Sequence, residues 1–407
     1  MTKMNLFKIS EIELTYKRKV KARNRPKVAS SIDAYKLFRE NWDDLTINLQ
    51  EEFKIFLFVG SFTEGEEREG IYVYELDVTD GSLKEVEREG NLINPSFLTI
   101  SPNGKYLYAC TDTRLETHGS VSAFKIDSLT GKITFLNKQT AGGRNPVHVV
   151  VDKNNEYVVN SNYTDAGISI FKCASDGSLN PYSKLIKFEG SSIVSGRQDE
   201  AHIHSANFSD DNRFLFAPDL GADKIRVLTF NNSDLLTTSN ELEIQPKKGS
   251  GPRHFTFHPN NKFAYCVEEL SGSVSAYQYQ NGQLKWLDSY FSYSQQLETY
   301  SSADIHISPD GKFLYASNRL EDENTLSIFS IDETNGRLEL KGHQSTFGNL
   351  PRSFVIDPTG QFLIVANQNS GSIVVFKRNQ KSGLLTKMND EVKISLPSSL
   401  KMRKYQK

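Results

Sequence analysis

The chain has 407 residues, 37% of them hydrophobic and 24% charged, and its 48 Lys and Arg nearly balance 50 Asp and Glu, for a net charge of −2. That length allows two or three average domains or one large β architecture, and the near-zero charge argues against the broad positive field that holds a nucleic acid. The longest uncharged apolar run, residues 56–62, is far too short to cross a bilayer, so we expect no membrane span.

The first 51 residues differ in pattern from the rest of the chain. A basic stretch, KRKVKARNRPK, precedes SSIDAYKLFRENWDDL, which predicts an amphipathic helix with Ser at its cap. The segment lacks the continuous apolar run of a secretory signal. Three cysteines lie far apart in apolar, strand-like runs and are expected to be reduced core thiols: Cys110, Cys173 and Cys266. Both features favour a cytoplasmic protein.

Residues 13–57 resemble the opening of the RadC-like JAB-domain proteins. The similarity covers the basic stretch, the helix after Ser-Ser-x-Asp-Ala-Tyr and the Glu-Glu-Phe that leads into a strand. That family carries its metal chemistry in a later His-x-His motif with downstream Ser and Asp, whereas this chain continues into a different architecture. Residues 1–51 are therefore predicted to be a separate extension, either a truncated RadC-like fragment or an unrelated helical leader.

A repeat fills the remainder of the chain. Six segments share a short apolar strand, a polar four-residue turn and a second strand, as in PSFLTISPNGKYLYACTD and SADIHISPDGKFLYASNR. The first residues of the six turns are Ser101, Asp152, Ser209, His258, Ser308 and Asp357, at intervals of 51, 57, 49, 50 and 49 residues. A period near 50 without helical periodicity is typical of the four-stranded blades of a β-propeller.

The repeat also predicts how the ring closes. Seven copies of a third strand can be counted, beginning with GIYVYELD at Gly70, but the first unit lacks its innermost strand. LPSSLKM, residues 396–402, matches that missing strand. We therefore predict an all-β, seven-bladed propeller over residues 52–403, closed by a C-terminal strand in the first blade, which removes free sheet edges.

Equivalent positions in the blades indicate where a site lies. Five residues before each turn marker, near the start of the innermost strand, stand Ser96, Val147, His204, Arg253, Ala303 and Arg352. Ten and eleven residues after it, the next strand returns to the same rim with Thr111 and Asp112, Asn162 and Tyr163, Asp219 and Leu220, Glu268 and Glu269, Asn318 and Arg319, and Asn367 and Gln368. Both rows are expected to converge on one mouth of the central channel. One imidazole, three guanidinium groups and several carboxylates or amides there predict a pocket for a small anionic molecule.

Structural ion pairs between blades are the competing interpretation of each charged rim residue taken alone. His148, His254 and His306 fall at other offsets and are expected to pack or form hydrogen bonds. The usual zinc-ligand spacings, a glycine-rich phosphate loop before a helix and a Gly-x-Ser-x-Gly motif are all missing from the sequence. We therefore expect no obligatory metal, no cofactor and no serine acyl-transfer chemistry.

Residues 55–402 resemble the propeller lactonase family, which includes the cycloisomerase-2 type 6-phosphogluconolactonases and the fungal carboxymuconate cyclases. The most specific stretch is GRQDEAHIHSANFSDDNRFLFAPDLGADKIRVLTF, and GSGPRHFTFHPNNKFAYCVEELSGSVSAY resembles the next blade. Where the family commonly has Asn-Glu-Leu, Glu268 replaces the Asn and Glu269 takes the Glu position. The resemblance implies catalytic roles for His202, His204, Arg253 and Glu269, and substrate contacts from Arg319, Arg352, Asp219, Asn367 and Asn162.

The activity implied is hydrolysis of a sugar lactone, most specifically 6-phospho-D-glucono-1,5-lactone to 6-phosphogluconate in the pentose phosphate pathway. His204 or Glu269 would deprotonate the attacking water, Arg253 would stabilise the oxyanion, and Arg319 and Arg352 would hold the phosphate. A carboxymuconate-type lactonising cyclase uses the same kind of cationic pocket. A non-catalytic propeller that binds a partner at its rim is the third alternative, and it predicts a large exposed apolar patch. We expect a monomer or weak oligomer without nucleic-acid or membrane partners.

Overall fold

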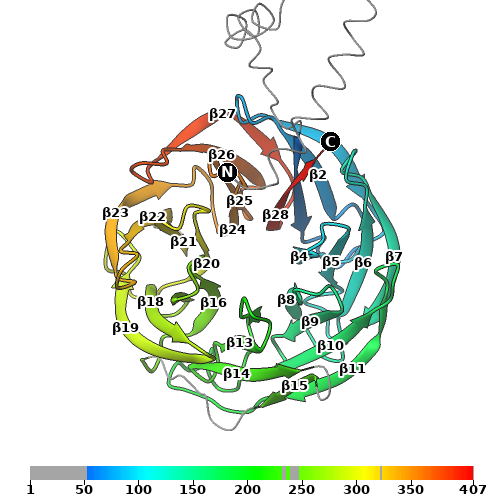
Figure 1. Cartoon of the computed structure of the whole chain (residues 1–407), viewed down its shortest axis with the longest axis horizontal. Coiled ribbons are helices and arrows are strands. Elements are labelled where there is room, and N and C mark those ends of the chain that lie inside the picture. The colour runs from blue at the N-terminus through cyan, green and yellow to red at the C-terminus, as the bar shows by residue number, and fades with distance from the viewer. Residues whose placement is uncertain (1–52, 232–234, 239–246, 321–322, 407) are drawn as a thin grey trace, which may run out of the picture. The chain divides into compact units, whose positions relative to one another are not determined.

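The computed structural model describes residues 53–231, 235–238, 247–320 and 323–406. All the regular secondary structure of these residues is β-strand, arranged as seven four-stranded antiparallel sheets around a central axis (Figure 1). The predicted seven-bladed propeller is thus confirmed. The predicted N-terminal helix and the RadC-like segment lie outside the described residues, and no helix within them is long and apolar enough to span a membrane.

Counted from the centre outward, each blade consists of four strands. Blade 1 contains β28 (Pro397–Gln406), β1 (Phe53–Ser61), β2 (Ile71–Leu76) and β3 (Leu83–Glu89); blade 2, β4 (Phe97–Ile100), β5 (Tyr106–Thr111), β6 (Ser120–Ile126) and β7 (Ile133–Thr140); blade 3, β8 (Pro146–Val151), β9 (Tyr157–Asn162), β10 (Gly167–Cys173) and β11 (Leu179–Lys187); blade 4, β12 (Asn207–Phe208), β13 (Phe214–Asp219), β14 (Lys224–Asn231) and β15 (Leu235–Thr238). Blade 5 contains β16 (Pro252–Phe257), β17 (Phe263–Glu268), β18 (Ser273–Gln280) and β19 (Gln283–Phe291); blade 6, β20 (Ser302–Ile307), β21 (Phe313–Leu320), β22 (Glu323–Ile331) and β23 (Leu338–Ser345); blade 7, β24 (Pro351–Ile356), β25 (Phe362–Asn367), β26 (Ser372–Arg378) and β27 (Leu385–Lys393).

The hydrophobic core is divided among the interfaces between blades. Seven clusters of buried side chains each join two neighbouring blades, and together they run around the whole ring. The middle strands are buried on both faces, as in β25, where all six residues are buried. This explains why these strands are continuous apolar runs and why the outermost strands, such as β7, alternate with exposed residues.

Aromatic side chains and turn glycines connect the blades at their outer turns. Gly336, in the turn between β22 and β23, has φ +73°, and a Cβ there would lie 2.3 Å from the ring of Phe263 in blade 5. The hydroxyl of Tyr265 donates a hydrogen bond to the carbonyl of the same glycine at 2.9 Å. Tyr315 and Gly383 repeat this pair one blade further on. The same contact between an aromatic side chain and a turn glycine thus joins blade 5 to blade 6 and blade 6 to blade 7.

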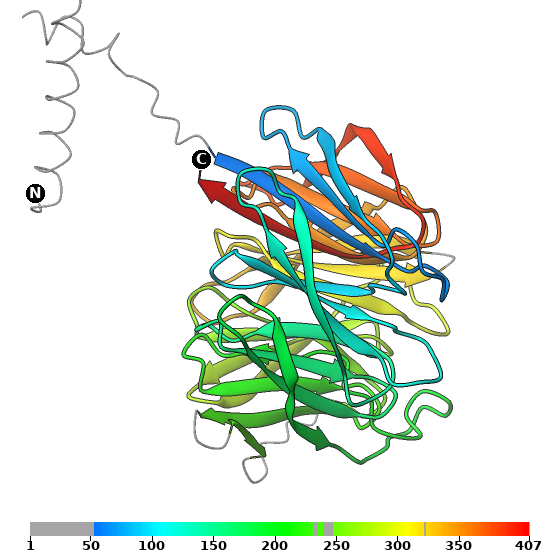
Figure 2. The ribbon, with the colours of Figure 1, turned by 90° about the vertical axis from the view of Figure 1, so that its right-hand side faces the viewer.

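The C-terminal strand closes the ring as predicted. β28 pairs antiparallel with β1 from Phe53 opposite Gln406 to Gly60 opposite Ser399, and Figure 2 shows the two strands side by side. The hydroxyl of Ser398 donates to the carbonyl of Ser96 at 3.0 Å, and the hydroxyl of Ser399 accepts from the amide of Leu98 at 3.0 Å. The last strand therefore joins blade 1 to blade 2 as well. It continues to Gln406, beyond the predicted end of the domain at residue 403.

Truncating Leu400 tests this closure. Its side chain is fully buried in the cluster between blades 1 and 7, so Leu400→Ala should lower the free energy of unfolding by about 2–5 kcal/mol. Leu384→Ala, at a half-exposed position, is the matched control and should cost less than about 0.5 kcal/mol. Equal costs in urea unfolding would contradict the closure.

Candidate functional site

A cavity of about 210 Å³ opens where the innermost strands begin, at one mouth of the central channel. Residues from all seven blades contribute to it, and most of them are polar. The lining consists of Phe62, Ser96, Arg114, Asn145, Val147, Tyr163, Arg197, His204, Arg253, Glu269, Arg319 and Arg352. Five arginines face a single carboxylate, which makes the cavity suited to a small anion.

The row of residues near the start of the innermost strands lies where the repeat predicts. His204, Arg253 and Arg352 line the cavity together with Ser96 and Val147. Ala303, the remaining member of the row, supplies its carbonyl oxygen, which accepts a hydrogen bond from Nε of Arg253 at 2.8 Å. The structure therefore brings the predicted imidazole and two of the predicted guanidinium groups together.

The residues ten and eleven positions after the turn markers, at the end of the second strands, were both expected to line the cavity. Only residues at the eleventh position do so. Tyr163, Glu269 and Arg319, at the eleventh position, line it. Their neighbours at the tenth position do not, because successive residues of a strand point to opposite faces. The prediction that Asn162, Asp219 and Asn367 bind substrate is therefore not supported.

The three residues at the tenth position are buried and form their hydrogen bonds outside the cavity. Nδ2 of Asn162 donates to the carbonyl of Ala141 at 3.0 Å, and Nδ2 of Asn367 donates to the carbonyl of Thr346 at 3.0 Å. Asp219 accepts from the guanidinium of Arg226 at 2.9 Å. These side chains hold the connections between strands rather than the lining of the cavity.

His202 also lies outside the cavity lining. Its ring stacks on Tyr163 with centroids 4.3 Å apart, its Nδ1 contacts the Tyr163 carbonyl at 3.1 Å, and its amide donates to Asp219 at 2.8 Å. It supports a lining residue instead of facing a substrate, so its predicted catalytic role is not supported. Among the described residues, no group of three His, Cys, Asp or Glu side chains could hold a metal ion.

Glu269 is bonded to three of the five arginines. Its Oε1 accepts from Arg197 at 2.5 Å, and its Oε2 accepts from Arg253 at 2.8 Å and from Arg319 at 3.1 Å. Burial opposes ionisation, but the three guanidinium groups outweigh it and lower the pKa of Glu269 to about 2. The carboxylate is therefore ionised throughout the physiological pH range.

His204 is held beside this cluster as a neutral imidazole. Its side chain is buried, Nε2 contacts a guanidinium nitrogen of Arg253, and Nδ1 has no hydrogen-bond partner among the described residues. Burial and the charge of Arg253 hold the pKa of His204 well below its usual value of 6.5. A guanidinium group can only donate hydrogen bonds, so Nε2 of His204 must be the acceptor and carry the lone pair. The ring hydrogen is therefore on Nδ1.

Four lining residues were not assigned by the sequence analysis. Phe62 follows β1 and is equivalent in blade 1 to the residues eleven positions after the turn markers. Comparison of equivalent positions in the blades could therefore have predicted it. Arg197 lies in the connection between β11 and β12, within the longest interval of the repeat. Arg114 and Asn145 lie in other connections between strands, where the index does not apply.

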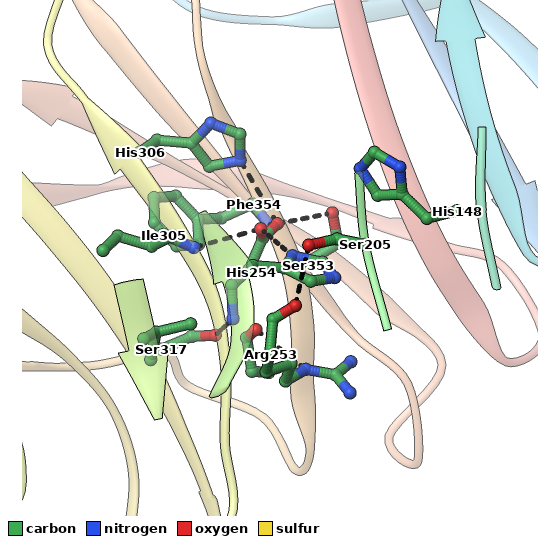
Figure 3. A network of polar contacts seen from close by, with 12 residues as sticks. His148, Ser205, Arg253, His254, Ile305, His306, Ser317, Ser353 and Phe354 are labelled. Atoms are coloured by element: carbon green, nitrogen blue, oxygen red, sulfur yellow. Dashed lines mark hydrogen bonds and ion pairs between the residues drawn. The ribbon is translucent and has the colours of Figure 1, made fainter. Parts of the chain in front are cut away.

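A network of polar contacts in the channel supports the strand that carries Arg253 (Figure 3). Nδ1 of His254 and Nε2 of His306 contact the carboxylate of Asp304 at 2.8 and 3.2 Å, and the hydroxyl of Ser353 donates to it at 3.0 Å. Asp304 therefore links blades 5, 6 and 7. On the other side, the hydroxyl of Ser205 donates to the carbonyl of Arg253 at 2.8 Å, which fixes the backbone beneath the guanidinium.

The family model of the seven-bladed β-propeller lactonases matches residues 56–402. The chain belongs to this lactonase family. A 6-phosphogluconolactonase from Formosa agariphila is 48% identical over 353 residues, which are 86% of this chain and 99% of that protein. The 6-phosphogluconolactonase of Bacillus subtilis is 34% identical over 84% of this chain and 97% of its own length.

A solved lactonase structure has the same architecture. The periplasmic gluconolactonase of Pseudomonas aeruginosa superposes with a TM-score of 0.81 at 32% identity, covering 86% of this chain and 99% of that one. A crystal structure from Bacteroides fragilis gives the same TM-score at 35% identity, covering 88% of this chain and 99% of that one. The lactonase ring is therefore complete within this chain, and the cavity lies at the mouth of its channel.

Replacing Glu269 tests the charge cluster. Its lowered pKa adds stability that is fully present above pH 4.5 and is lost as the pH falls through about 2. When the pH is lowered from 4.5 to 2, the free energy of unfolding of the wild-type protein should fall by about 3 kcal/mol more than that of the Glu269→Gln protein. Urea unfolding at each pH measures this difference.

The neighbouring Glu268 is the matched control. Burial raises its pKa, so Glu268→Gln should leave the fall in stability at acid pH at least as large as in the wild type. A Glu269→Gln protein with the wild-type pH dependence would show that the carboxylate is not held by the arginines.

Proposed function

We propose that this lactonase hydrolyses 6-phospho-D-glucono-1,5-lactone to 6-phosphogluconate. The observation that carries the proposal is the cavity lining, in which five arginines surround one carboxylate and a neutral histidine. This composition suits a substrate with an anionic group remote from a carbonyl that becomes negatively charged during reaction. The 6-phosphogluconolactonases of Formosa agariphila and Bacillus subtilis support the same substrate.

His204 is the better of the two candidate bases. His204 is neutral because its pKa is lowered, and its lone pair meets one guanidinium group, that of Arg253. Both oxygens of Glu269 are engaged by guanidinium groups, and a carboxylate with a pKa of about 2 is a weak proton acceptor. We assign Glu269 to holding Arg253 and Arg319 in place.

The reaction then needs one proton acceptor and one oxyanion partner. Water attacks the lactone carbonyl carbon while His204 takes one of its protons, and Arg253 donates to the carbonyl oxygen as charge develops on it. When the bond from this carbon to the ring oxygen breaks, His204 returns the proton to that oxygen, which becomes a hydroxyl group. Arg253 contacts Nε2 of His204 in the structure, so this step requires the guanidinium to turn from the imidazole toward the substrate.

The remaining assignments are also proposals. Three free cysteines support a cytoplasmic location, and the near-zero net charge supports a protein without nucleic-acid or membrane partners. We propose a monomer or weak oligomer. On their sequence alone, residues 1–51 are proposed to be a separate extension, either a truncated RadC-like fragment or an unrelated helical leader.

Single substitutions of His204 and Arg253 test the mechanism. His204→Ala should lower kcat by about 10²- to 10⁴-fold through loss of the base, and Arg253→Ala by about 10²- to 10³-fold through loss of the oxyanion partner. Initial rates with 6-phosphogluconolactone, corrected for spontaneous hydrolysis, measure both effects. Wild-type rates in both variants would overturn the assignment.

Arg213→Ala is the matched control. Arg213 is an exposed arginine before β13, at the end of the blade opposite the cavity, where it pairs with Asp211. Its loss should leave the rate unchanged.

A further inference from the structure

The five arginines of the cavity fall into two groups. Arg197, Arg253 and Arg319 are bonded to Glu269. Arg114 and Arg352 have no carboxylate within ion-pair distance among the residues that the structure describes. Glu269 offsets one of the three charges in the first group, whereas the two charges on Arg114 and Arg352 have no carboxylate beside them.

Arg114 and Arg352 share one neighbour. The guanidinium carbon of Arg114 lies 3.9 Å from the ring centroid of Phe62, and that of Arg352 lies 5.3 Å from it. The negative face of an aromatic ring attracts a guanidinium group without occupying its N–H donors. Both groups are thus held on one wall of the cavity with their donors available to a ligand.

The surroundings of the two groups disfavour positive charge. Burial and the neighbouring guanidinium groups of Arg253, Arg319 and Arg114 lower the pKa of Arg352. Burial and Arg319 lower the pKa of Arg114. An anion bound between the two arginines would relieve this repulsion.

The backbone at Arg114 directs its side chain into the cavity at a cost. Arg114 has φ +59°, in the left-handed region that non-glycine residues rarely adopt. Such strained conformations concentrate at ligand-binding sites, where the surrounding structure maintains them. Asn145 also lines the cavity in this conformation, at φ +54°, but asparagine adopts it more readily than arginine. Arg114 is one of the two arginines that Glu269 does not contact.

We propose that Arg114 and Arg352, with Phe62 as the supporting wall, form the subsite for the phosphate group of the substrate, and that Arg114 determines the preference for a phosphorylated lactone. This inference rests on the proposed function. A phosphate dianion matches two guanidinium groups in charge and in its capacity to accept paired N–H donors. Arg319 was predicted from the sequence to bind the phosphate, but in the structure it is bonded to Glu269.

The division of the cavity matches the two ends of the substrate. The lactone carbonyl lies at one end of the sugar chain and the phosphate at the other. His204 and Arg253 would act on the first, and Arg114 and Arg352 would hold the second. An unphosphorylated lactone would use only the first half of the cavity.

The test compares Arg114→Gln with the wild type on 6-phosphogluconolactone and on glucono-1,5-lactone. Loss of a charge-assisted contact to phosphate should lower kcat/KM for the phosphorylated lactone about tenfold to a hundredfold, mainly through KM. The value for glucono-1,5-lactone should change by less than about twofold. Arg114→Lys, which keeps the charge without the planar fork, should fall between them.

Arg337→Gln is the matched control, because Arg337 is exposed and lies at the opposite end of the blade, paired with Asp288. It should leave both substrates unaffected, and thermal unfolding should confirm that each variant is folded. An equal fractional loss on both lactones for Arg114→Gln, or no loss on the phosphorylated one, would overturn the phosphate subsite.

The failure of the proposed function would be a separate result, in which wild-type protein does not accelerate 6-phosphogluconolactone hydrolysis. The subsite is then decided by calorimetric titration with inorganic phosphate. Binding by the wild type that is lost in Arg114→Gln would support the subsite, and failure of the wild type to bind phosphate would overturn it.

Discussion

The pairing of β28 with β1 is the constraint on which the rest of the molecule depends. The cavity is lined by residues from Phe62 to Arg352, which are distant in sequence and meet only because seven blades close into a ring. The closing strand also contacts the site directly, since Ser398 donates to the carbonyl of Ser96 in the cavity wall. Closure therefore determines both the stability of the fold and the geometry of the channel mouth.

Within the closed ring, one buried carboxylate organises the charge of the cavity. Glu269 engages Arg197, Arg253 and Arg319, and it thereby fixes the guanidinium that stands next to His204. The carboxylate is too strongly stabilised as an anion to exchange protons readily. A polar network centred on Asp304 supports the same strand from within the channel. The cavity thus combines a half in which three guanidinium groups share one carboxylate with a half in which two guanidinium groups have none.

The sequence predicted the parts of the site that share the geometry of the repeat. Arg253 and Arg352 occupy equivalent positions in their blades, and a shared index predicts a shared location because each blade has the same strand order. The index failed for Asp219 because it did not separate the two faces of a strand. Positions counted from the turn markers could not predict Arg114 and Arg197, because these residues lie in connections of differing length and conformation. The 57-residue interval that contains Arg197 did mark an insertion, but the position of its side chain depends on tertiary contacts with Glu269.

The proposed cavity has two halves, one for the reacting carbonyl and one for the remote phosphate. A crystal structure of the wild-type protein with bound 6-phosphogluconate would locate both ends of the product. We expect the phosphate against Arg114 and Arg352 and the carboxylate of the product against Arg253 and His204. A phosphate bound against Arg253 and His204, or a product bound outside the cavity, would contradict it.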